Sequence, residues 1–143
     1  MDYHAAQPSS ILASVKVFYI EDDKTNQYIV GKIIELSGGA IQFNTSGFPE
    51  TIIPRLRIFR PHIILMDLML AGGINGFDTA REIHRIGILS RIPIVAVSSS
   101  DTAIEIPKAR QSGMRGFIPK PVDSQTFPGY IRRILDGETL WLG

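Results

Sequence analysis

The chain has 143 residues, of which 44% are apolar and 20% charged, and its formal net charge is +1. This length suits one domain that can bury its own core, and it leaves little room for a second domain. The chain has no cysteine, which excludes disulfides and thiolate zinc sites. Because the charge is nearly balanced and Lys and Arg form no long run, direct binding to nucleic acid is not expected.

Neither a membrane span nor a secretory signal is evident in the sequence. The longest apolar runs, residues 63–66 and 92–97, are far shorter than the roughly 20 residues of a membrane-spanning helix. Residues 11–15 are too short and too interrupted to form a signal peptide. We therefore expect a cytoplasmic protein that has no membrane partner.

Short apolar runs alternate with longer amphipathic segments along most of the chain. Residues 1–14 have no clear period, so we expect an N-terminal arm followed by a domain at 15–143. The runs expected to form strands lie at residues 15–20, 40–44, 62–66, 92–97 and 115–118. The segments expected to form helices lie at residues 24–36, 49–59, 76–86, 102–112 and 124–135, the last with Asp123 as its N-cap.

The order of these elements, a strand and then a helix repeated five times, predicts a doubly wound α/β fold. The second, third and fourth runs are nearly all apolar, as expected for parallel strands that are covered on both faces. Right-handed crossovers would place helices on both sides of the sheet. Ligands of such folds bind at the carboxyl ends of the strands.

Four polar clusters interrupt the apolar pattern where the predicted strands end. Residues 21–23, all acidic, follow the first strand, and Asp67 follows the third. Residues 98–100, all serine, follow the fourth strand, and Lys120 lies between two prolines after the fifth. Because parallel strands end at the same edge of a sheet, the four clusters are expected to lie together.

Carboxylates that lie close together repel one another, and a divalent cation relieves this repulsion. Mg²⁺ suits such a site because it prefers oxygen ligands and needs only one or two carboxylates beside phosphate oxygens. A carboxylate held by Mg²⁺ could attack phosphorus, while a lysine and a hydroxyl share the charge on the transferring oxygens. Each residue alone is weak evidence, since Asp23 can be only a helix cap and Lys120 only a surface charge. The coincidence of the four clusters supports the prediction.

This pattern resembles the receiver domains of bacterial response regulators, including the stand-alone chemotaxis type, over roughly residues 15–135. The resemblance implies a flavodoxin-like, five-stranded parallel sheet with strand order 2-1-3-4-5. It also implies that Asp67 accepts a phosphoryl group from a histidine kinase or a histidine phosphotransfer protein, with Mg²⁺ as the cofactor. The surface of the fourth helix, fifth strand and fifth helix would then control the binding of a downstream protein.

The resemblance also implies a role for individual residues around Asp67. Asp22 matches the direct metal ligand, and Glu21 matches the acid that acts through water. Met69 would give its backbone carbonyl to the metal. The remaining matches are Ser98 for the hydroxyl that follows the phosphoryl group, Phe117 for the aromatic switch, and Lys120, with a cis bond to Pro121, for the phosphate-pairing lysine.

Two regions depart from the family pattern. Ala71 stands where the family usually has proline, and Gly76 comes one residue late, so the loop at 71–75 is one residue longer than usual. Pro107 falls inside the predicted fourth helix, where a proline removes one hydrogen bond and clashes with the preceding turn. We therefore expect this helix to start late, near Pro107, or to be kinked there, with residues 101–105 as a turn or loose loop.

Other interpretations remain open at this point. Haloacid-dehalogenase-like phosphatases also use an aspartate at a strand end, but they place a second aspartate where this chain has Met69. A flavodoxin-type binding module would not need Glu21, Asp22, Asp67 and Lys120 together. The chain could also be a receiver domain cut from a longer regulator or hybrid kinase, although we favour a stand-alone protein. Both a monomer and a homodimer are compatible with the sequence.

Overall fold

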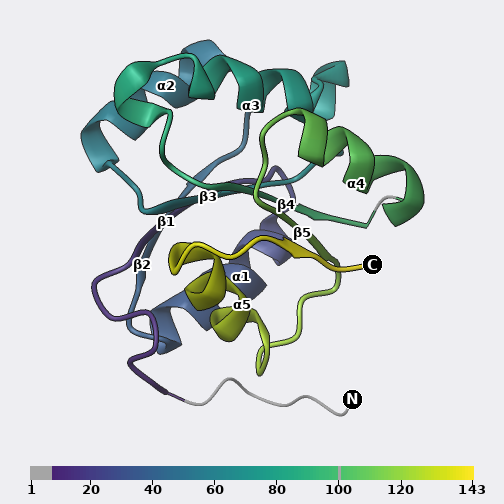
Figure 1. Ribbon diagram of the computed structural model, residues 1–143. Coiled ribbons are helices and arrows are strands. Elements are labelled where there is room, and N and C mark those ends of the chain that lie inside the picture. Colours follow the sequence, from purple (N-terminus) through teal and green to yellow (C-terminus); the bar gives the residue numbers. More distant parts are fainter. Residues whose placement is uncertain (1–7, 100) are drawn as a thin grey trace.

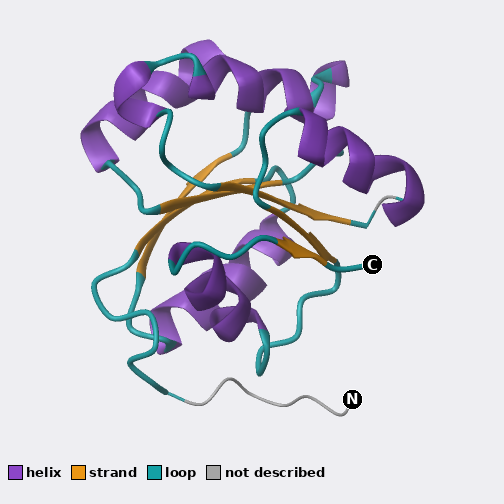
Figure 2. Cartoon of the chain, in the orientation of Figure 1, coloured by secondary structure: helices purple, strands orange, loops and turns teal. Residues whose placement is uncertain are grey.

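The computed structural model describes residues 8–99 and 101–143, which form a parallel sheet between two layers of helices (Figures 1 and 2). The strands are β1 (Lys16–Ile20), β2 (Ala40–Asn44), β3 (Ile63–Met66), β4 (Ile94–Ser98), β5 (Gly116–Pro119) and β6 (Leu140–Trp141). The helices are α1 (Lys24–Leu36), α2 (Pro49–Phe59), α3 (Gly76–His84), α4 (Thr102–Gln111) and α5 (Phe127–Leu135). The sheet order is β2-β1-β3-β4-β5-β6, which confirms the predicted order of the first five strands.

Each face of the sheet has its own apolar core because successive side chains of a strand point to opposite faces. Val17 and Tyr19 of β1 pack with α1 and α5, whereas Phe18 and Ile20 pack with α2, α3 and α4. All four residues of β3 are buried, two in each core. The apolar runs in the sequence thus reflect strands that are covered on both sides.

The predicted N-terminal arm lies partly outside the described residues, which begin at residue 8. Leu12 is fully buried in the core beneath α1 and α5, and its N–H donates to the carbonyl of Ser37 at 2.9 Å. The N–H of Ser9 donates to the carbonyl of Leu36 at 2.8 Å. Residues 8–14 therefore lie against the end of α1.

The start of α4 differs from the prediction. The helix begins at Thr102 and continues through Pro107 to Gln111, so the predicted late start and the loop at 101–105 are wrong. The carboxylate of Asp101 accepts from the N–H of Ala103 at 3.0 Å, and its carbonyl accepts from Glu105 at 2.9 Å. Because these bonds close the first turn, the helix can form before Pro107 is reached. Pro107 and Ala103, whose carbonyl faces the missing N–H, are both exposed, so water can hydrate that carbonyl.

The start of α5 also differs from the prediction. The helix begins at Phe127, with Thr126 in the cap position, so the assignment of Asp123 as the N-cap is wrong. Asp123 instead stabilises the preceding turn, where its carboxylate accepts from the N–H of Gln125 at 2.8 Å. Pro128 lies in the first turn of the helix, where a proline is readily accommodated. The other predicted elements are confirmed to within two residues at each end.

The sixth strand was not predicted. Residues Leu140 and Trp141 of β6 pair with Gly116 and Phe117 of β5, in parallel, and cover the edge that β5 would otherwise expose. The guanidinium of Arg110 in α4 lies 4.8 Å from the centre of the Trp141 ring. This contact joins the last strand to the helix above it.

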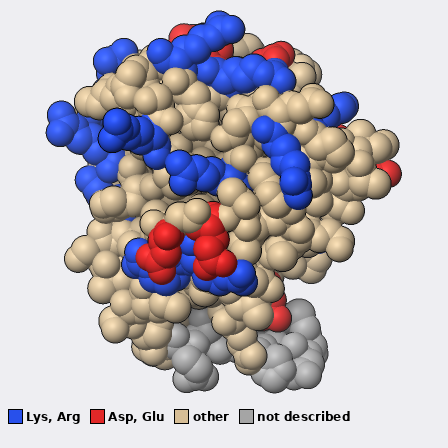
Figure 3. Space-filling view, in the orientation of Figure 1, with Lys and Arg blue, Asp and Glu red and all other residues tan. Residues whose placement is uncertain are grey.

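Charged side chains of both signs lie on the surface. On the face seen in Figure 3, several Lys and Arg side chains lie over the layer of α2, α3 and α4. Acidic and basic side chains gather beside the turn after α5, where Arg133 pairs with Glu138 at 2.9 Å. None of the helices in the described part of the chain combines the length and apolar character needed to cross a membrane.

Candidate functional site

Glu21, Asp67 and Lys120 are placed by strand pairing that continues one residue beyond the strands. Their backbone N–H groups donate to carbonyls of β2, β1 and β4 respectively, at 2.9–3.0 Å. The three residues therefore lie at the same edge of the sheet, as predicted. Asp22 joins them, and the carboxylates of Glu21, Asp22 and Asp67 offer oxygens that all lie within 4.8 Å of one another.

Glu21 is fully buried and accepts hydrogen bonds on both carboxylate oxygens. Its Oε1 accepts from the hydroxyl of Tyr19 at 2.9 Å and from Nζ of Lys120 at 2.6 Å. Its Oε2 accepts from the backbone N–H groups of Asp22 at 3.1 Å and Asp23 at 3.4 Å. Burial by itself would raise the pKa of Glu21, but the contact with Lys120, and then those with Asp67 and Tyr19, hold the pKa below its usual value. Glu21 is therefore a charged and fixed acceptor.

Asp67 is also buried, with 4% of its surface exposed, but fewer hydrogen-bond donors contact its carboxylate than contact that of Glu21. Its Oδ1 accepts from the backbone N–H of Met69 at 3.1 Å and lies 3.5 Å from Nζ of Lys120. Burial, reinforced by the neighbouring Glu21, raises the pKa of Asp67 to about 6, although Met69 and Lys120 oppose this rise. The charge of Asp67 is thus only partly compensated by the protein.

The remaining acidic residues of the first cluster have different environments. Asp22 is more exposed than Glu21 and Asp67, at the rim of the site. Asp23 caps α1, since its carboxylate accepts from the N–H of Thr25 at 3.0 Å. The interpretation of Asp23 as a helix cap is therefore confirmed.

Ser98 and Met69 border the acidic edge. Ser98 is fully buried at the end of β4, where its carbonyl accepts from the backbone N–H of Lys120 at 2.9 Å. Met69 has a side chain that is 67% exposed, and its backbone forms a bridge with Asn75 across the long loop. Ser100, the last serine of the predicted cluster, lies outside the described residues.

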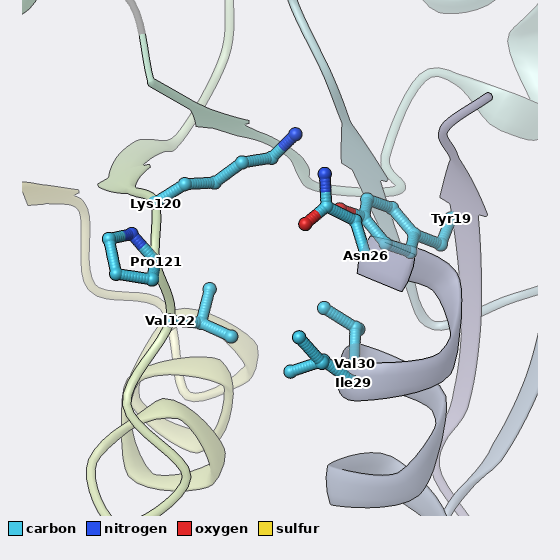
Figure 4. A pocket seen from close by; sticks show the side chains of 7 residues that line it. All are labelled: Tyr19, Asn26, Ile29, Val30, Lys120, Pro121 and Val122. Atoms are coloured by element: carbon cyan, nitrogen blue, oxygen red, sulfur yellow. The ribbon is translucent and has the colours of Figure 1, made fainter. Parts of the chain in front are cut away.

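Phe117 does not lie at the acidic edge. It is fully buried in the core that faces α2, α3 and α4, three positions before Lys120 along the chain. The bond between Lys120 and Pro121 is cis, as the family resemblance implied. A small cavity of about 50 Å³ lies beside Lys120, between the loop after β5 and helix α1 (Figure 4).

Tyr19 and Gln27 were not predicted as residues of the site. Tyr19 was expected only as part of an apolar strand, although Tyr19 and Glu21 are two positions apart and thus share a face. The side-chain amide of Gln27 donates to the carbonyl of Glu21 at 2.7 Å. A buried tyrosine needs a partner for its hydroxyl, so this spacing was an available signal.

Comparisons with known proteins agree with this arrangement. The profile of the response regulator receiver domain family matches residues 17–132. Protein PilH of Pseudomonas aeruginosa is 25% identical over 122 residues, which cover 85% of this chain and 98% of PilH. The polar-differentiation response regulator DivK of Brucella anthropi is 27% identical over 119 residues, which cover 83% of this chain and 94% of DivK.

A solved structure supports the fold independently. The chemotaxis response regulator CheY4 of Vibrio cholerae matches with a TM-score of 0.76 at 16% identity, over 85% of this chain and 99% of CheY4. At this identity the match is evidence for the fold alone. Because the family profile covers most of the chain and the acidic edge is present, the chain belongs to the response regulator receiver domain family of two-component signalling.

Proposed function

We propose that this chain is a phosphorylation switch in which Asp67 accepts a phosphoryl group from a histidine kinase or a histidine phosphotransfer protein. Receiver domains pair with histidine kinases and act as signalling switches, not as enzymes that turn over a substrate, which removes the phosphatase alternative. The observation that carries the proposal is the setting of Asp67. It is a buried carboxylate at the end of β3, beside Glu21, Asp22 and the ammonium group of Lys120.

In the proposed reaction, a carboxylate oxygen of Asp67 forms a bond to phosphorus. The bond between phosphorus and the imidazole nitrogen of the donor breaks, and the imidazole leaves with the electron pair and takes up a proton. Lys120 is placed to bind an oxygen of the transferred group, because its Nζ already lies 3.5 Å from Asp67. The hydroxyl of Ser98 would bind another of these oxygens.

The residues at the acidic edge fit Mg²⁺, since their carboxylate oxygens are the ligands that this ion prefers. Asp22, Asp67 and the backbone carbonyl of Met69 would hold it directly. Glu21 would act through water, and the hydrogen bonds that already occupy both of its oxygens support this indirect role. Bound Mg²⁺ would supply positive charge that offsets both the carboxylate repulsion and the charge on the transferring oxygens.

Phosphorylation would then shift the population between two states of the β4–β5 region. The acyl phosphate carries a charge of about −2 in place of the single negative charge of the carboxylate. It also brings several acceptor oxygens beside Ser98 and Lys120, whose backbones are hydrogen-bonded to each other. Phe117 lies on the same strand as this contact, so a shift of the strand end is transmitted to its ring. The surface of α4, β5 and α5 would present this change to a downstream protein.

The proposal is tested by intact mass after incubation with acetyl phosphate, with and without Mg²⁺. We expect the wild type to gain the mass of one phosphoryl group only when Mg²⁺ is present. Asp67→Asn should gain none. Asp78→Asn is a matched control, because Asp78 forms an exposed ion pair with Arg81 on α3, and it should be labelled normally. Equal labelling of Asp67→Asn would contradict the proposal.

A further inference from the structure

Tyr19 brings a hydroxyl group into the apolar core beneath the acidic edge. The residue is fully buried in β1, and its hydroxyl donates to Oε1 of Glu21 at 2.9 Å. A tyrosine hydroxyl keeps its proton at neutral pH, because its usual pKa is about 10, and an ionised carboxylate can only accept a hydrogen bond. Tyr19 is therefore a permanent hydrogen-bond donor to Glu21.

The same oxygen of Glu21 also accepts from Lys120. The Lys120 ammonium lies 2.6 Å from Glu21 and 3.5 Å from Asp67, so in this structure it is bonded to Glu21 and only near Asp67. A phosphoryl group on Asp67 would draw the ammonium of Lys120 away from Glu21, because its oxygens carry more negative charge than the carboxylate that they replace. The departure of Lys120 removes one donor from a buried carboxylate, and each hydrogen bond that a buried charge loses destabilises it.

We infer that Tyr19 is a positioning residue, whose hydroxyl keeps Glu21 hydrogen-bonded while Lys120 moves from Glu21 to the phosphoryl group. The inference rests on the proposed function, since it assumes that Asp67 carries the phosphoryl group. Figure 4 shows Lys120 and Tyr19 on the two sides of the cavity of about 50 Å³, with the lysine extended from the loop after β5. The cavity leaves the lysine side chain space to change conformation.

The inference predicts a specific effect of Tyr19→Phe, which keeps the ring and removes only the hydroxyl. When Lys120 leaves Glu21 in this variant, Oε1 has lost both of its side-chain donors, so the lysine is held on Glu21. We expect the affinity for beryllofluoride, a phosphoryl analogue, to fall roughly tenfold in the presence of Mg²⁺, as measured by calorimetry. Tyr28→Phe is the matched control, because the Tyr28 side chain is 70% exposed on α1, and it should bind normally.

Repeating the substitution in the Lys120→Ala variant distinguishes a positioning role of Tyr19 from a purely structural role. In Lys120→Ala no lysine leaves Glu21 on binding, so adding Tyr19→Phe should not lower the beryllofluoride affinity further. Equal losses in both backgrounds, or an affinity of Tyr19→Phe within twofold of the wild type, would overturn the inference. Failure of the folded wild type to bind beryllofluoride with Mg²⁺ would instead contradict the proposed function, and the inference would fall with it.

Discussion

The acidic edge and the corner of α4, β5 and β6 are held by opposite kinds of interaction. At the acidic edge, the carboxylates of Glu21, Asp22 and Asp67 lie close together, Lys120 lies beside two of them, and the pKa of Asp67 is raised to about 6. At the corner, β6 pairs with β5, Leu140 is buried, and Trp141 stacks beneath Arg110. In the first region the charge of Asp67 opposes folding, whereas in the second region packing and strand pairing favour folding.

This difference predicts opposite effects of substitution in the two regions. Removing the carboxylate of Asp67 from the acidic edge should stabilise the free protein, because its pKa is raised on folding, whereas removing the cation Lys120 should destabilise it. At the corner, any change that separates β6 from β5 should destabilise the protein without altering the acidic edge. Functional sites often violate local rules of stability in this way.

Lys120→Met should have the largest effect on stability, a loss of about 3 kcal/mol at pH 7 in urea unfolding, because it leaves buried carboxylates without their cation. The contact with Lys120 lowers the pKa of Glu21 in the folded state. The stabilisation is therefore present above the usual pKa of glutamate, and it is lost as the pH falls below about 4. The gap between variant and wild type should narrow at that pH, and a gap that stays constant would show that the lysine acts by packing alone.

Gly116→Ala tests the corner. A Cβ atom at this position would lie 2.8 Å from the backbone carbonyl oxygen of Leu140, so β6 has to move away from β5. We expect a loss of about 2 kcal/mol, as for other overpacked sites. Because Trp141 is the only tryptophan of the chain, its fluorescence should shift toward longer wavelengths as it becomes more exposed.

Gly129→Ala is the matched control for this prediction. A Cβ atom there meets nothing within 4 Å, and the residue lies inside α5. The substitution should stabilise the protein by about 0.5–1 kcal/mol through helix propensity and leave the fluorescence unchanged. Equal effects of the two substitutions would refute the steric role of Gly116.

Pro107→Ala should have a smaller effect than Gly116→Ala and in the opposite direction, a gain in stability of about 1 kcal/mol. Alanine restores an N–H that can donate to the carbonyl of Ala103. The gain is limited for two reasons: Ala103 is exposed, so water can already hydrate its carbonyl, and the unfolded chain gains conformational entropy when proline is removed. Urea unfolding measures the change. A loss of stability would show that Pro107 is needed for the conformation of α4.

The acidic edge could be predicted from the sequence because its residues directly follow strands. Glu21 and Asp67 interrupt apolar runs, and the parallel arrangement then brings them together. The position of Lys120, closer to Glu21 than to Asp67, could not be predicted, because it depends on side-chain conformation. Charge pattern therefore locates the site, while contacts between side chains determine how its charges are shared.

The corner could not be predicted for a different reason. Strand β6 has only two residues, which are too few to show the alternation of apolar and polar residues that predicts a strand. It forms by pairing with β5, after α5 has returned the chain to the sheet. In α4, the tendency of Pro107 to interrupt a helix predicted a late start, but the helix begins at Thr102, where Asp101 caps it. Interactions beyond the local sequence decide both features.

The most direct test of the acidic edge is urea unfolding of the wild type and Asp67→Asn at pH 7, with and without Mg²⁺. A carboxyl whose pKa is raised from 3.8 to about 6 on folding opposes folding when ionised, and this effect disappears below about pH 4. Without Mg²⁺, we expect Asp67→Asn to be more stable than the wild type by about 2 kcal/mol. With Mg²⁺, the wild type should gain stability and the variant little. A less stable variant without Mg²⁺, or equal stabilisation of both proteins by Mg²⁺, would contradict the role assigned to Asp67.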